Sequence, residues 1–558
     1  MNKTIIFTLL FIGSVVLRGQ PTDFTNKIDS VLATQILNGT PGGVVGVVKD
    51  GKVLYKKIFG FANLDYGIPV TDSTVFNLAS VSKQFTAFLV LLLEKDGKLN
   101  LDDTVQKYIP ELKSYGHQIT IRQLVHHTSG IPTYDILQLF AGIPSKMPWD
   151  AEDQFNMIQS YHKLNFKPNE EFMYSNDGYF LLARIIEKVT GTTFSKCIRE
   201  KIFEPLDMKN AVINDSPGKI ILNRASGYKK IGEIFTETNT EANSTCGYSN
   251  VYASVNDLIN WSINLTGKSL GGEQLFDRIF NATDTLNSGE TISYTYGFST
   301  WSPGGPKKVY HEGGTEGFRA YLSHFPETGF SVFVMANGET NNHVTLADKI
   351  ADLCLKDLLK PEIKKEYKEI TLNKELYQPY KGEYLLSYAD VLKFDVVNDT
   401  LKLTFSDGKV VNMYPEKENE FFLKEFDAQC TFVKGSSGKV DEIVWHQYNK
   451  KFKGLRYTEP KPLRKKELQS FTGKYEFPGF NITYSIYIKD NDLIMTLPNI
   501  FKKQYGIDPD IVLTHRLGDI FFGMLNKVEF KRNREGKVSS FIIADVGRVR
   551  NLEFTKID

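Results

Sequence analysis

The sequence has little cysteine and no surplus of charge of either sign. Its four cysteines, spread over 558 residues, are Cys197, Cys246, Cys354 and Cys430. Because no Cys-x-x-Cys pair or Cys/His cluster occurs, the sequence predicts neither a disulfide framework nor a structural zinc site. Lys and Arg number 67 against 66 Asp and Glu, a formal net charge of +1. Without a basic surplus, nucleic acid is not an expected partner.

Long apolar runs are absent after the first twenty residues. Met1–Lys3 is short and basic, and Thr4–Leu17 is almost wholly apolar, which is the layout of a secretory signal. A buried N-terminal helix is the alternative, but residues 18–21 (Arg-Gly-Gln-Pro) break the pattern. We therefore expect a signal peptide at residues 1–20, a periplasmic or secreted protein, and no membrane span. No cysteine lies there, so no lipid anchor is expected at that point.

The length predicts more than one domain, since about 150 residues is typical of a domain. The composition, with 41% hydrophobic and 24% charged residues, is that of a folded globular protein. A helix expected at residues 348–359 stops before Pro361, and a lysine- and glutamate-rich stretch runs on to Glu369. Placing a boundary there gives three predicted domains, at residues 21–362, 363–460 and 461–558.

The first predicted domain mixes strands and helices. Two apolar runs flank Lys49-Asp50-Gly51 in residues 44–54, which is typical of a β-hairpin. A second pair of strands is expected in residues 321–337, turned at Pro326–Gly329. The spacing of apolar residues predicts amphipathic helices at residues 82–95, 179–190 and 254–265.

One pattern occurs twice in the C-terminal third, about 90 residues apart. A Glu-Leu pair, an aromatic residue, a glycine and a tyrosine are followed by a short apolar run in each copy. They are Glu375-Leu376, Tyr380, Gly382 and Tyr384, and then Glu467-Leu468, Phe471, Gly473 and Tyr475. The repeat predicts two tandem all-β modules, each a small closed barrel with its own core. A single larger β domain is the alternative.

Ser80-Val-Ser-Lys83 is the first candidate for chemistry. A Ser and a Lys three residues apart at a helix start share one face, with Cβ atoms about 5–6 Å apart, so the amine can take the hydroxyl proton. The motif alone is weak, because other serines have the same spacing to a lysine and chance explains most matches. They are Ser160, Ser216, Ser226, Ser406 and Ser436. Only Ser80 opens a strongly apolar helix.

Six ordered segments raise this candidate above the others. They are Asn-Leu-Ala-Ser-Val-Ser-Lys (77–83), Gly-Lys-Leu-Asn-Leu-Asp-Asp (97–103), Leu-Val-His-His-Thr-Ser-Gly (124–130), Tyr-Ser-Asn-Asp-Gly-Tyr (174–179), Gly-Tyr-Ser-Asn (247–250) and His-Glu-Gly-Gly (311–314). Together they resemble the penicillin-recognising serine hydrolases, a superfamily of class C β-lactamases, D-Ala-D-Ala carboxypeptidases, esterases and D-aminopeptidases. The resemblance covers about residues 22–355. It implies an α/β (α+β) fold of the β-lactamase/transpeptidase type, an antiparallel sheet flanked by helices, followed here by two lipocalin-like barrels.

The resemblance also assigns roles. Ser80 would be the acylated nucleophile and Lys83 its proton partner, while Tyr174 would act as a phenolate or as a hydrogen-bond relay to the leaving group. Tyr248 opens a second Tyr-x-Asn, but only Tyr174 has the Gly-Tyr-Phe-Leu-Leu continuation of the superfamily. Asn176 would bind the substrate amide, or would serve as the N-cap of the following helix.

The third motif departs from the β-lactamase pattern. His311-Glu-Gly-Gly stands where β-lactamases often carry Lys-Thr-Gly on an edge strand. Small residues such as Gly313 would let that strand lie beside the substrate, and the backbone N–H groups of Ser80 and Gly314 would form an oxyanion hole. A histidine is mostly neutral at pH 7, whereas a lysine is a permanent cation. The motif, with the tandem barrels, therefore resembles esterases and D-aminopeptidase more than β-lactamases.

The expected function is a serine hydrolase that cleaves an amide or ester through an acyl-enzyme, without cofactor or metal. His126-His127 has no Glu or Asp at ligand spacing, so a metal site is not predicted there. Short peptides containing D-amino acids, or small esters, are the expected substrates. The alternatives are a β-lactamase or D-Ala-D-Ala carboxypeptidase, and a sensor that binds penicillin or cell-wall fragments without turnover.

Overall fold

The computed structural model describes residues 22–33, 39–144, 147–238, 244–302, 305–339, 342–356, 358, 367–386, 390–435, 438–447 and 450–557. The predicted signal peptide at residues 1–20 lies outside them, as does most of the predicted linker. None of the helices in this part of the chain combines the length and apolar character needed to cross a bilayer.

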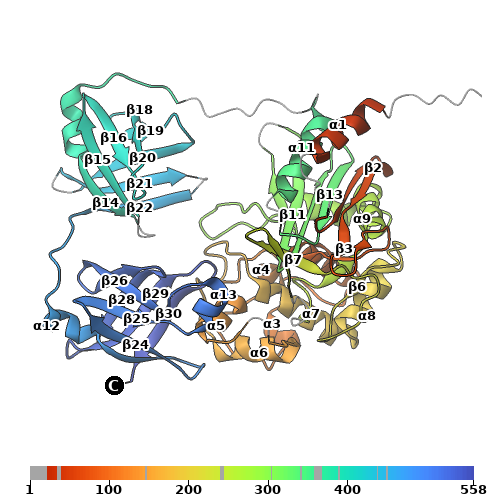
Figure 1. Cartoon of the computed structure of the whole chain (residues 1–558), viewed down its shortest axis with the longest axis horizontal. Helices are drawn as coiled ribbons and strands as arrows, with labels where there is room; N and C mark the ends of the chain where they lie inside the picture. The colour runs from red at the N-terminus through yellow and green to blue at the C-terminus, as the bar shows by residue number, and fades with distance from the viewer. Residues whose placement is uncertain are drawn as a thin grey trace, which may run out of the picture.

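An antiparallel sheet with strand order β10-β11-β12-β13-β1-β2 forms the centre of the first domain (Figure 1). Its strands are β1 (Gly43–Lys49), β2 (Lys52–Phe59), β10 (Ser299–Trp301), β11 (Lys308–Thr315), β12 (Phe318–Phe325) and β13 (Phe330–Ala336). Both predicted strand pairs are confirmed. Asp50 and Gly51 turn the first hairpin with φ of 50° and 72°, the left-handed conformation that such tight turns favour. β1 also pairs with β13, Gly43 opposite Ala336, so segments from the two ends of the domain complete one sheet.

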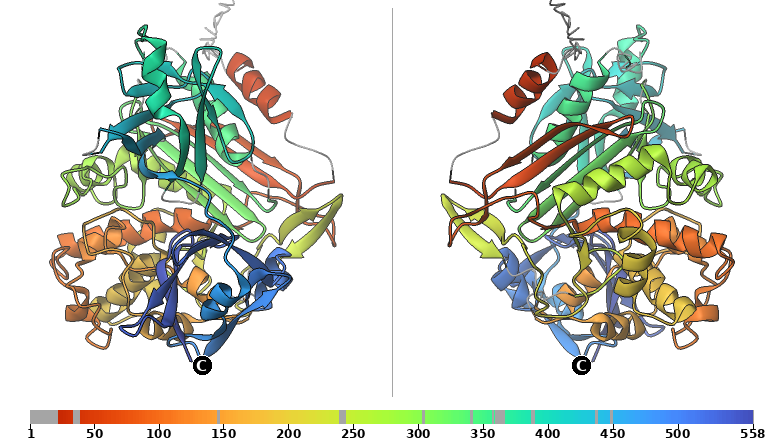
Figure 2. Two further views of the ribbon diagram at one scale, coloured as in Figure 1. Left: turned by 90° about the vertical axis from the view of Figure 1, so that its left-hand side faces the viewer. Right: turned by 90° about the vertical axis from the view of Figure 1, so that its right-hand side faces the viewer.

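Helices cover both faces of this sheet. Successive residues of β1 point to opposite sides: Val45 and Val47 belong to the core under α1 and α11, while Val44 and Val48 belong to the core that contains α2 and α9. Figure 2 shows α1 and α9 on opposite sides of the strands. The layering confirms the expected fold class. The helices are α1 (Thr22–Ala33), α2 (Lys83–Lys95), α9 (Val255–Gly267) and α11 (His343–Leu355).

The part of the first domain between β2 and β10 in the sequence is mainly helical. Its helices are α3 (Val105–Tyr108), α4 (Ile121–Val125), α5 (Tyr134–Phe140), α6 (Ala151–Ser160), α7 (Asn176–Thr190) and α8 (Phe194–Ile198), with the turn η2 (Arg199–Phe203) and, later, α10 (Glu273–Asn281). Short strands connect the region to the sheet: β3 (Phe61–Asn63) with β4 (Ile68–Pro69), β5 (Phe76–Asn77) and β6 (Val212–Ile213) with β9 (Val251–Ala253), and β7 (Gly227–Ile231) with β8 (Ile234–Thr238).

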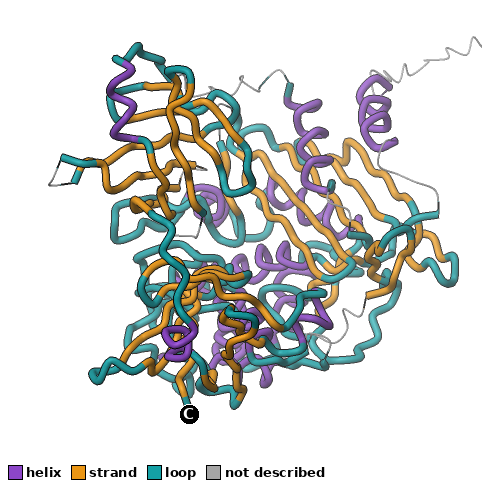
Figure 3. Tube along the Cα trace, turned by 60° about the vertical axis from the view of Figure 1, so that its left-hand side comes forward, coloured by secondary structure: helices purple, strands orange, loops and turns teal. Residues whose placement is uncertain are grey.

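The C-terminal strands form two separate sheets rather than one larger domain (Figure 3). Module 1 joins η4 (Lys374–Tyr380), β14 (Gly382–Leu386), β15 (Val391–Val397), β16 (Thr400–Thr404), β17 (Val410–Asn412), β18 (Tyr414–Pro415), β19 (Glu420–Phe422), β20 (Ala428–Lys434), β21 (Val440–Gln447) and β22 (Lys450–Tyr457). Its end strands, β17 and β18, are separated in the chain only by Met413.

Module 2 is a closed barrel. Its elements are α12 (Lys465–Leu468), η5 (Gln469–Phe471), β23 (Gly473–Phe477), β24 (Ile482–Lys489), β25 (Asp492–Thr496), α13 (Ile500–Tyr505), β26 (Asp510–Leu517), β27 (Ile520–Gly523), β28 (Asn526–Arg532), β29 (Val538–Asp545) and β30 (Arg550–Lys556). The repeat has a structural basis, because Tyr384 and Tyr475 each donate a hydrogen bond to the backbone carbonyl four residues earlier. Module 1 keeps its own core.

Module 2 does not keep a separate core, contrary to the sequence-based expectation. Its apolar residues are continuous with the core of the helical region, where Phe140 meets the ring of Phe501 at a centroid distance of 5.5 Å. The Tyr484 hydroxyl donates to the carbonyl of Phe140 at 2.7 Å, which satisfies an end carbonyl of α5. Figure 1 shows the barrel against α5. The barrel and the first domain are therefore packed as one body.

Candidate active site

Ser80 lies on a strained turn between a short strand and a long helix. It belongs to η1 (Ala79–Ser82), which leads directly into α2. Ala79 has φ of 45°, a left-handed conformation that costs a non-glycine residue on the order of 1 kcal/mol or more. The Asn77 side chain holds this conformation, since its Oδ1 accepts a hydrogen bond from the Ala79 N–H at 2.8 Å. The turn leaves Ser80 partly exposed between buried neighbours.

The Lys83 amine contacts the Ser80 hydroxyl and two acceptors. Its Nζ lies 3.3 Å from Ser80 Oγ, 2.9 Å from Asn176 Oδ1 and 3.0 Å from the carbonyl oxygen of Tyr248. The Asn176 and Tyr248 oxygens can only accept hydrogen bonds, so they fix two N–H groups of the amine. The remaining position of the nitrogen therefore faces Ser80 Oγ.

Burial favours the neutral form of the Lys83 amine. Lys83 is fully buried. Desolvation lowers its pKa well below the usual value near 10.5, and the charge of Arg548 lowers it further, while Asp135 opposes the shift. A neutral lysine amine has a lone pair and can accept a proton. The environment of Lys83 thus favours a proton acceptor beside Ser80.

Tyr174 stands next to the amine with its hydroxyl unsatisfied. Its ring centre is 4.6 Å from Lys83 Nζ. The hydroxyl is buried and has no hydrogen-bond partner of normal geometry among the described residues. Burial raises the pKa of the phenol, and Ser80 and Arg548 partly offset that rise. The phenol therefore keeps its proton at neutral pH.

His127 positions the segment that carries Tyr174. Its Nδ1 accepts the backbone N–H of Ser175 at 3.1 Å, and its ring lies 4.4 Å from the Tyr174 ring. Burial holds the pKa of His127 well below its usual value, so the ring is neutral. Within the described residues, no group of three or more His, Cys, Asp or Glu side chains gathers as metal ligands would. His127 thus acts as a packing and hydrogen-bonding residue.

The two Tyr-x-Asn segments make different contacts in the structure. Ser175 caps α7, with its Oγ accepting from the N–H of Gly178 at 3.3 Å, so the reading of Asn176 as the N-cap is wrong. Asn176 begins the helix and turns its Oδ1 toward Lys83. Tyr248 presents its backbone carbonyl to the same amine, and its hydroxyl lies 2.9 Å from that of Tyr134. Tyr174 is therefore the tyrosine whose hydroxyl is available near Ser80.

His311 is buried on β11 as a neutral ring. Its Nε2 lies 3.1 Å from the Tyr294 hydroxyl, and its Nδ1 lies 2.6 Å from the carbonyl oxygen of Glu312. Since that carbonyl can only accept, Nδ1 carries the proton and Nε2 accepts from Tyr294. Burial and the charge of Lys83 lower the pKa of His311 to about 3. His311 cannot supply the permanent cation that a lysine would supply there.

Gly313 brings β11 against the turn that carries the serine. A Cβ on Gly313 would lie 2.3 Å from the carbonyl oxygen of Leu78 and 3.1 Å from the backbone nitrogen of Ser80. Only glycine fits this approach, because backbone atoms cannot move aside as a flexible side chain can. At the exposed Gly314, a Cβ would come no closer than 3.7 Å to Arg319. The strand therefore places the backbone after Gly313 beside Ser80.

We expect Gly313→Ala to lower the rate of covalent labelling of Ser80 by a fluorophosphonate about 10²- to 10³-fold, the loss typical of a damaged oxyanion hole. The added methyl group would push β11 away from Ser80. Gly267→Ala is the matched control, because a Cβ at that position meets no atom within 4 Å. Equal labelling of both variants, with thermal unfolding unchanged, would contradict this account of Gly313.

Nothing in the sequence indicated Arg548, a cation that module 2 places at the site. The guanidinium carbon of Arg548 lies 4.8 Å from the centre of the Tyr174 ring. Arg548 lies in the turn between β29 and β30, and the Val-Gly-Arg-Val of residues 546–549 matches no motif that would have marked it. Tyr294, which fixes the His311 ring, was also missed, and Ser-Tyr-Thr-Tyr-Gly (293–297) offers no signal either.

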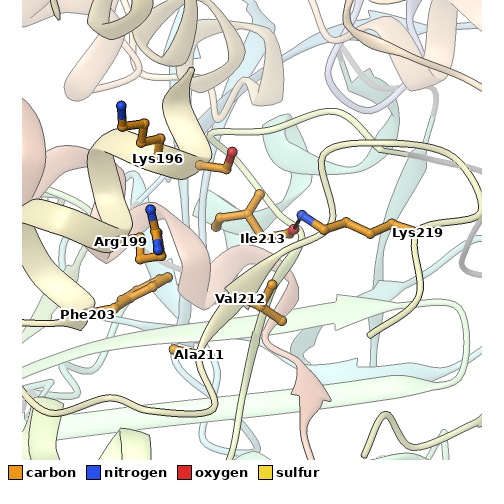
Figure 4. Close-up of a pocket in the computed structure, with 8 residues that line it drawn as sticks. Lys196, Arg199, Phe203, Ala211, Val212, Ile213 and Lys219 are labelled. Carbon is orange, nitrogen blue, oxygen red and sulfur yellow. Dashed lines mark hydrogen bonds between the residues drawn. The ribbon is translucent and has the colours of Figure 1, made fainter. Parts of the chain in front are cut away.

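A separate cavity of about 220 Å³ is lined by none of the candidate site residues (Figure 4). Three basic side chains line it, but each is paired: Lys196 with Glu200, Arg199 with Glu200 and Glu204, and Lys219 with Asp215. Figure 4 also shows the hydrogen bond that the Lys219 amine donates to the carbonyl oxygen of Ile213. Its cations are already neutralised, so the chemistry is better sought at Ser80.

Comparison with known proteins identifies the family. The model of the Beta-lactamase family matches residues 29–355, more than half of the chain. The protein belongs to this family, whose relatives are serine hydrolases, and the resemblance drawn from the motifs is confirmed.

The relatives include penicillin-binding proteins and D-aminopeptidases. Penicillin-binding protein 4* of Bacillus subtilis (strain 168) is 29% identical over 423 residues, covering 72% of this chain and 92% of that protein. The D-aminopeptidase of Brucella anthropi is 29% identical over 305 residues, covering 54% of this chain and only 56% of that protein. The octameric penicillin-binding protein homologue from Pyrococcus abyssi matches 85% of this chain and 97% of its own, with TM-score 0.53 and 22% identity. That likeness supports the fold alone.

Proposed function

We propose that the protein hydrolyses an amide or ester bond through an acyl-enzyme formed on Ser80, and that its substrates are short peptides containing D-amino acids or small esters. The observation that carries the proposal is the contact of a buried amine with the partly exposed Ser80 hydroxyl: Lys83 Nζ lies 3.3 Å from Ser80 Oγ, with its other contacts made to acceptors. No cofactor or metal takes part.

In the proposed reaction Lys83 is the base. Neutral Lys83 takes the proton of Ser80 Oγ as that oxygen forms a bond to the substrate carbonyl carbon. The backbone N–H groups of Ser80 and Gly314 stabilise the oxyanion. When the bond to the leaving group breaks, Tyr174 gives that group a proton and regains one from Lys83. Water then attacks the ester on Ser80, which releases the acid and restores the hydroxyl. Asn176 and His311 line the substrate site.

The pKa directions favour Lys83 over a Tyr174 phenolate as the base. Desolvation disfavours the charged form of both groups, so it lowers the pKa of the lysine and raises that of the tyrosine. At neutral pH this supports an uncharged amine and a protonated phenol, which are the states that a base and a relay need.

The substrate class rests on two points. The neutral His311 gives the third motif no permanent cation, which weakens the case for penicillin-like substrates. The D-aminopeptidase of Brucella anthropi is a relative that acts on D-aminoacyl compounds by its name. The second candidate is a β-lactamase or D-Ala-D-Ala carboxypeptidase, which the long match to penicillin-binding protein 4* favours.

A substrate panel with time-resolved intact-protein mass spectrometry tests the proposal. The panel comprises D- and L-aminoacyl amides, peptides, esters, benzylpenicillin and a chromogenic cephalosporin. We expect an acyl adduct that appears and clears with D-aminoacyl compounds or esters. Rapid clearance of the cephalosporin alone would replace the first candidate by the second. A permanent adduct with every acylating compound would contradict turnover and identify a sensor.

Export to the periplasm or the outside of the cell belongs to the same proposal. It rests on the apolar segment in residues 1–20. N-terminal sequencing of the mature protein should find a start near residue 20, and an intact Met1 would contradict export by this signal.

A further inference from the structure

We infer that Arg548, on the β29–β30 turn of module 2, is a substrate-binding residue that recognises a carboxylate on the leaving group, so that preferred peptide substrates end one residue beyond the cleaved bond. This inference rests on the proposed function, because it assigns a partner to the leaving-group side of the same site. It makes the barrel a part of the substrate pocket.

The position of Arg548 supports a role on the leaving-group side. Its guanidinium stacks over the ring of Tyr174, with 4.8 Å from the guanidinium carbon to the ring centre. In the proposed reaction Tyr174 passes a proton to the leaving nitrogen or oxygen. A group that lies against Tyr174 is therefore close to the atoms attached to that leaving atom. In a peptide with a free C-terminus, those atoms include a carboxylate on the carbon next to the leaving nitrogen.

No acidic side chain in the described part of the chain forms an ion pair with Arg548, which is exposed. The nearby acid Glu171 pairs instead with Arg550, at 2.8 Å. Asp135 acts on the same site by raising the pKa of Lys83, but it forms no ion pair with Arg548 among those residues. An arginine presents a planar array of N–H donors that suits a carboxylate.

The turn that carries Arg548 is anchored to the first domain where it leads into β30. Asn165 donates its Nδ2 hydrogen to the Arg548 carbonyl at 2.9 Å, and its Oδ1 accepts from the N–H of Arg550 at 2.8 Å. Lys163 and Glu553 form an ion pair at 2.6 Å beyond the turn. Because the Asn165 side chain holds the end of the turn that leads into β30, the backbone carbonyl of Arg548 is fixed while its guanidinium stays free to bind a ligand. Such preorganisation lowers the cost of binding.

The neutral His311 position of the third motif supports a role for Arg548 in binding an anionic substrate group. His311 is neutral where a lysine would have faced a substrate carboxylate. Arg548 supplies a permanent positive charge from a different element, the barrel. The two observations together point to an anionic substrate whose charge lies beside Tyr174.

The test compares two thioesters that differ in one charge. N-acetyl-D-alanyl thioglycolate has a carboxylate on its leaving thiol, and the corresponding thioglycolamide has none; thiol release is followed by colour in the full-length protein. We expect kcat/KM for the anionic thioester to exceed that for the neutral one about 10- to 100-fold, as a charged hydrogen bond predicts. Arg548→Gln should abolish this preference, so that the ratio of the two kcat/KM values falls to about one, and Arg548→Lys should restore part of it.

Arg534→Gln is the matched control. Arg534 is an exposed arginine in the β28–β29 turn, at the opposite end of the same barrel, so its loss should leave the preference unchanged. Equal rates for the two thioesters in the wild type, no hydrolysis of either, or an equal fall of both rates in Arg548→Gln would each overturn the inference. Labelling of Ser80 by a neutral fluorophosphonate separates these outcomes from failure of the proposed function, because only that failure would abolish labelling.

Discussion

Ser80→Ala should abolish turnover of every substrate that the wild type hydrolyses, with kcat falling on the order of 10⁵- to 10⁶-fold, as expected when a serine nucleophile is removed. The first chemical step of the proposed reaction depends on one oxygen, Ser80 Oγ, and no other group at the site replaces it. The fold should survive, because Ser80 is partly exposed and its side chain contacts the Lys83 amine without supporting an element of the core. Steady-state kinetics with a thermal unfolding curve for each variant measures the effect.

Ser406→Ala is the control for this prediction. Ser406 also stands three residues before a lysine, but it lies exposed on a turn of module 1, where its hydroxyl donates to Asp390 at 2.7 Å. Its loss should leave kcat unchanged. A substantial activity remaining in Ser80→Ala would remove Ser80 as the nucleophile.

Lys83→Met is expected to lower kcat/KM about 10²- to 10⁴-fold, the range that a positioned base contributes. Methionine has a similar length and no charge, so it fits a fully buried position while removing the proton acceptor. Lys95→Met on the same helix is the control, because Lys95 lies at the exposed end of α2 and donates a hydrogen bond to the Gly271 carbonyl, away from Ser80. Rates within tenfold of the wild type in Lys83→Met would contradict the role of Lys83 as base.

The pH dependence gives the same variant a second readout. The neutral amine is the active form, so the wild-type rate should fall as pH drops through the lowered pKa of Lys83 and the amine becomes protonated. His311, with its pKa lowered to about 3, stays neutral through this range and cannot cause the fall. Lys83→Met should lose this acidic limb. A limb that persists unchanged in the variant would assign the titration to another group.

The sequence marked the candidate site segments because their residues are chemically unusual in context, and the structure brings Ser80, Lys83 and Asn176 into contact. Ser80 and Lys83 stand at the start of an apolar helix, which distinguishes them from the other Ser-x-x-Lys matches. Helix starts were less predictable. α7 begins at Asn176 and not at Tyr179, because residues 176–178 are polar or small and add nothing to the apolar spacing. The same holds for α11, which begins at His343, five residues before the expected start.

The contribution of module 2 could not be predicted from the sequence. Arg548 lies 374 residues after Tyr174 in the chain (548 − 174), and local spacing carries no information on such a contact. The aromatic residues of the repeats predicted barrels, but Phe501 and Phe554 also pack against Phe140 of α5, so part of the barrel surface is core. A repeat in the sequence shows that two modules share a fold, and it does not show which module docks on the active site.

The most direct test of the central claim is to locate the covalent adduct by tandem mass spectrometry after brief reaction of the full-length protein with a neutral fluorophosphonate. The account predicts a single modified residue, Ser80, with labelling that slows sharply in Lys83→Met and disappears in Ser80→Ala. Modification of a different serine, or labelling of Ser80 that does not depend on Lys83, would contradict it.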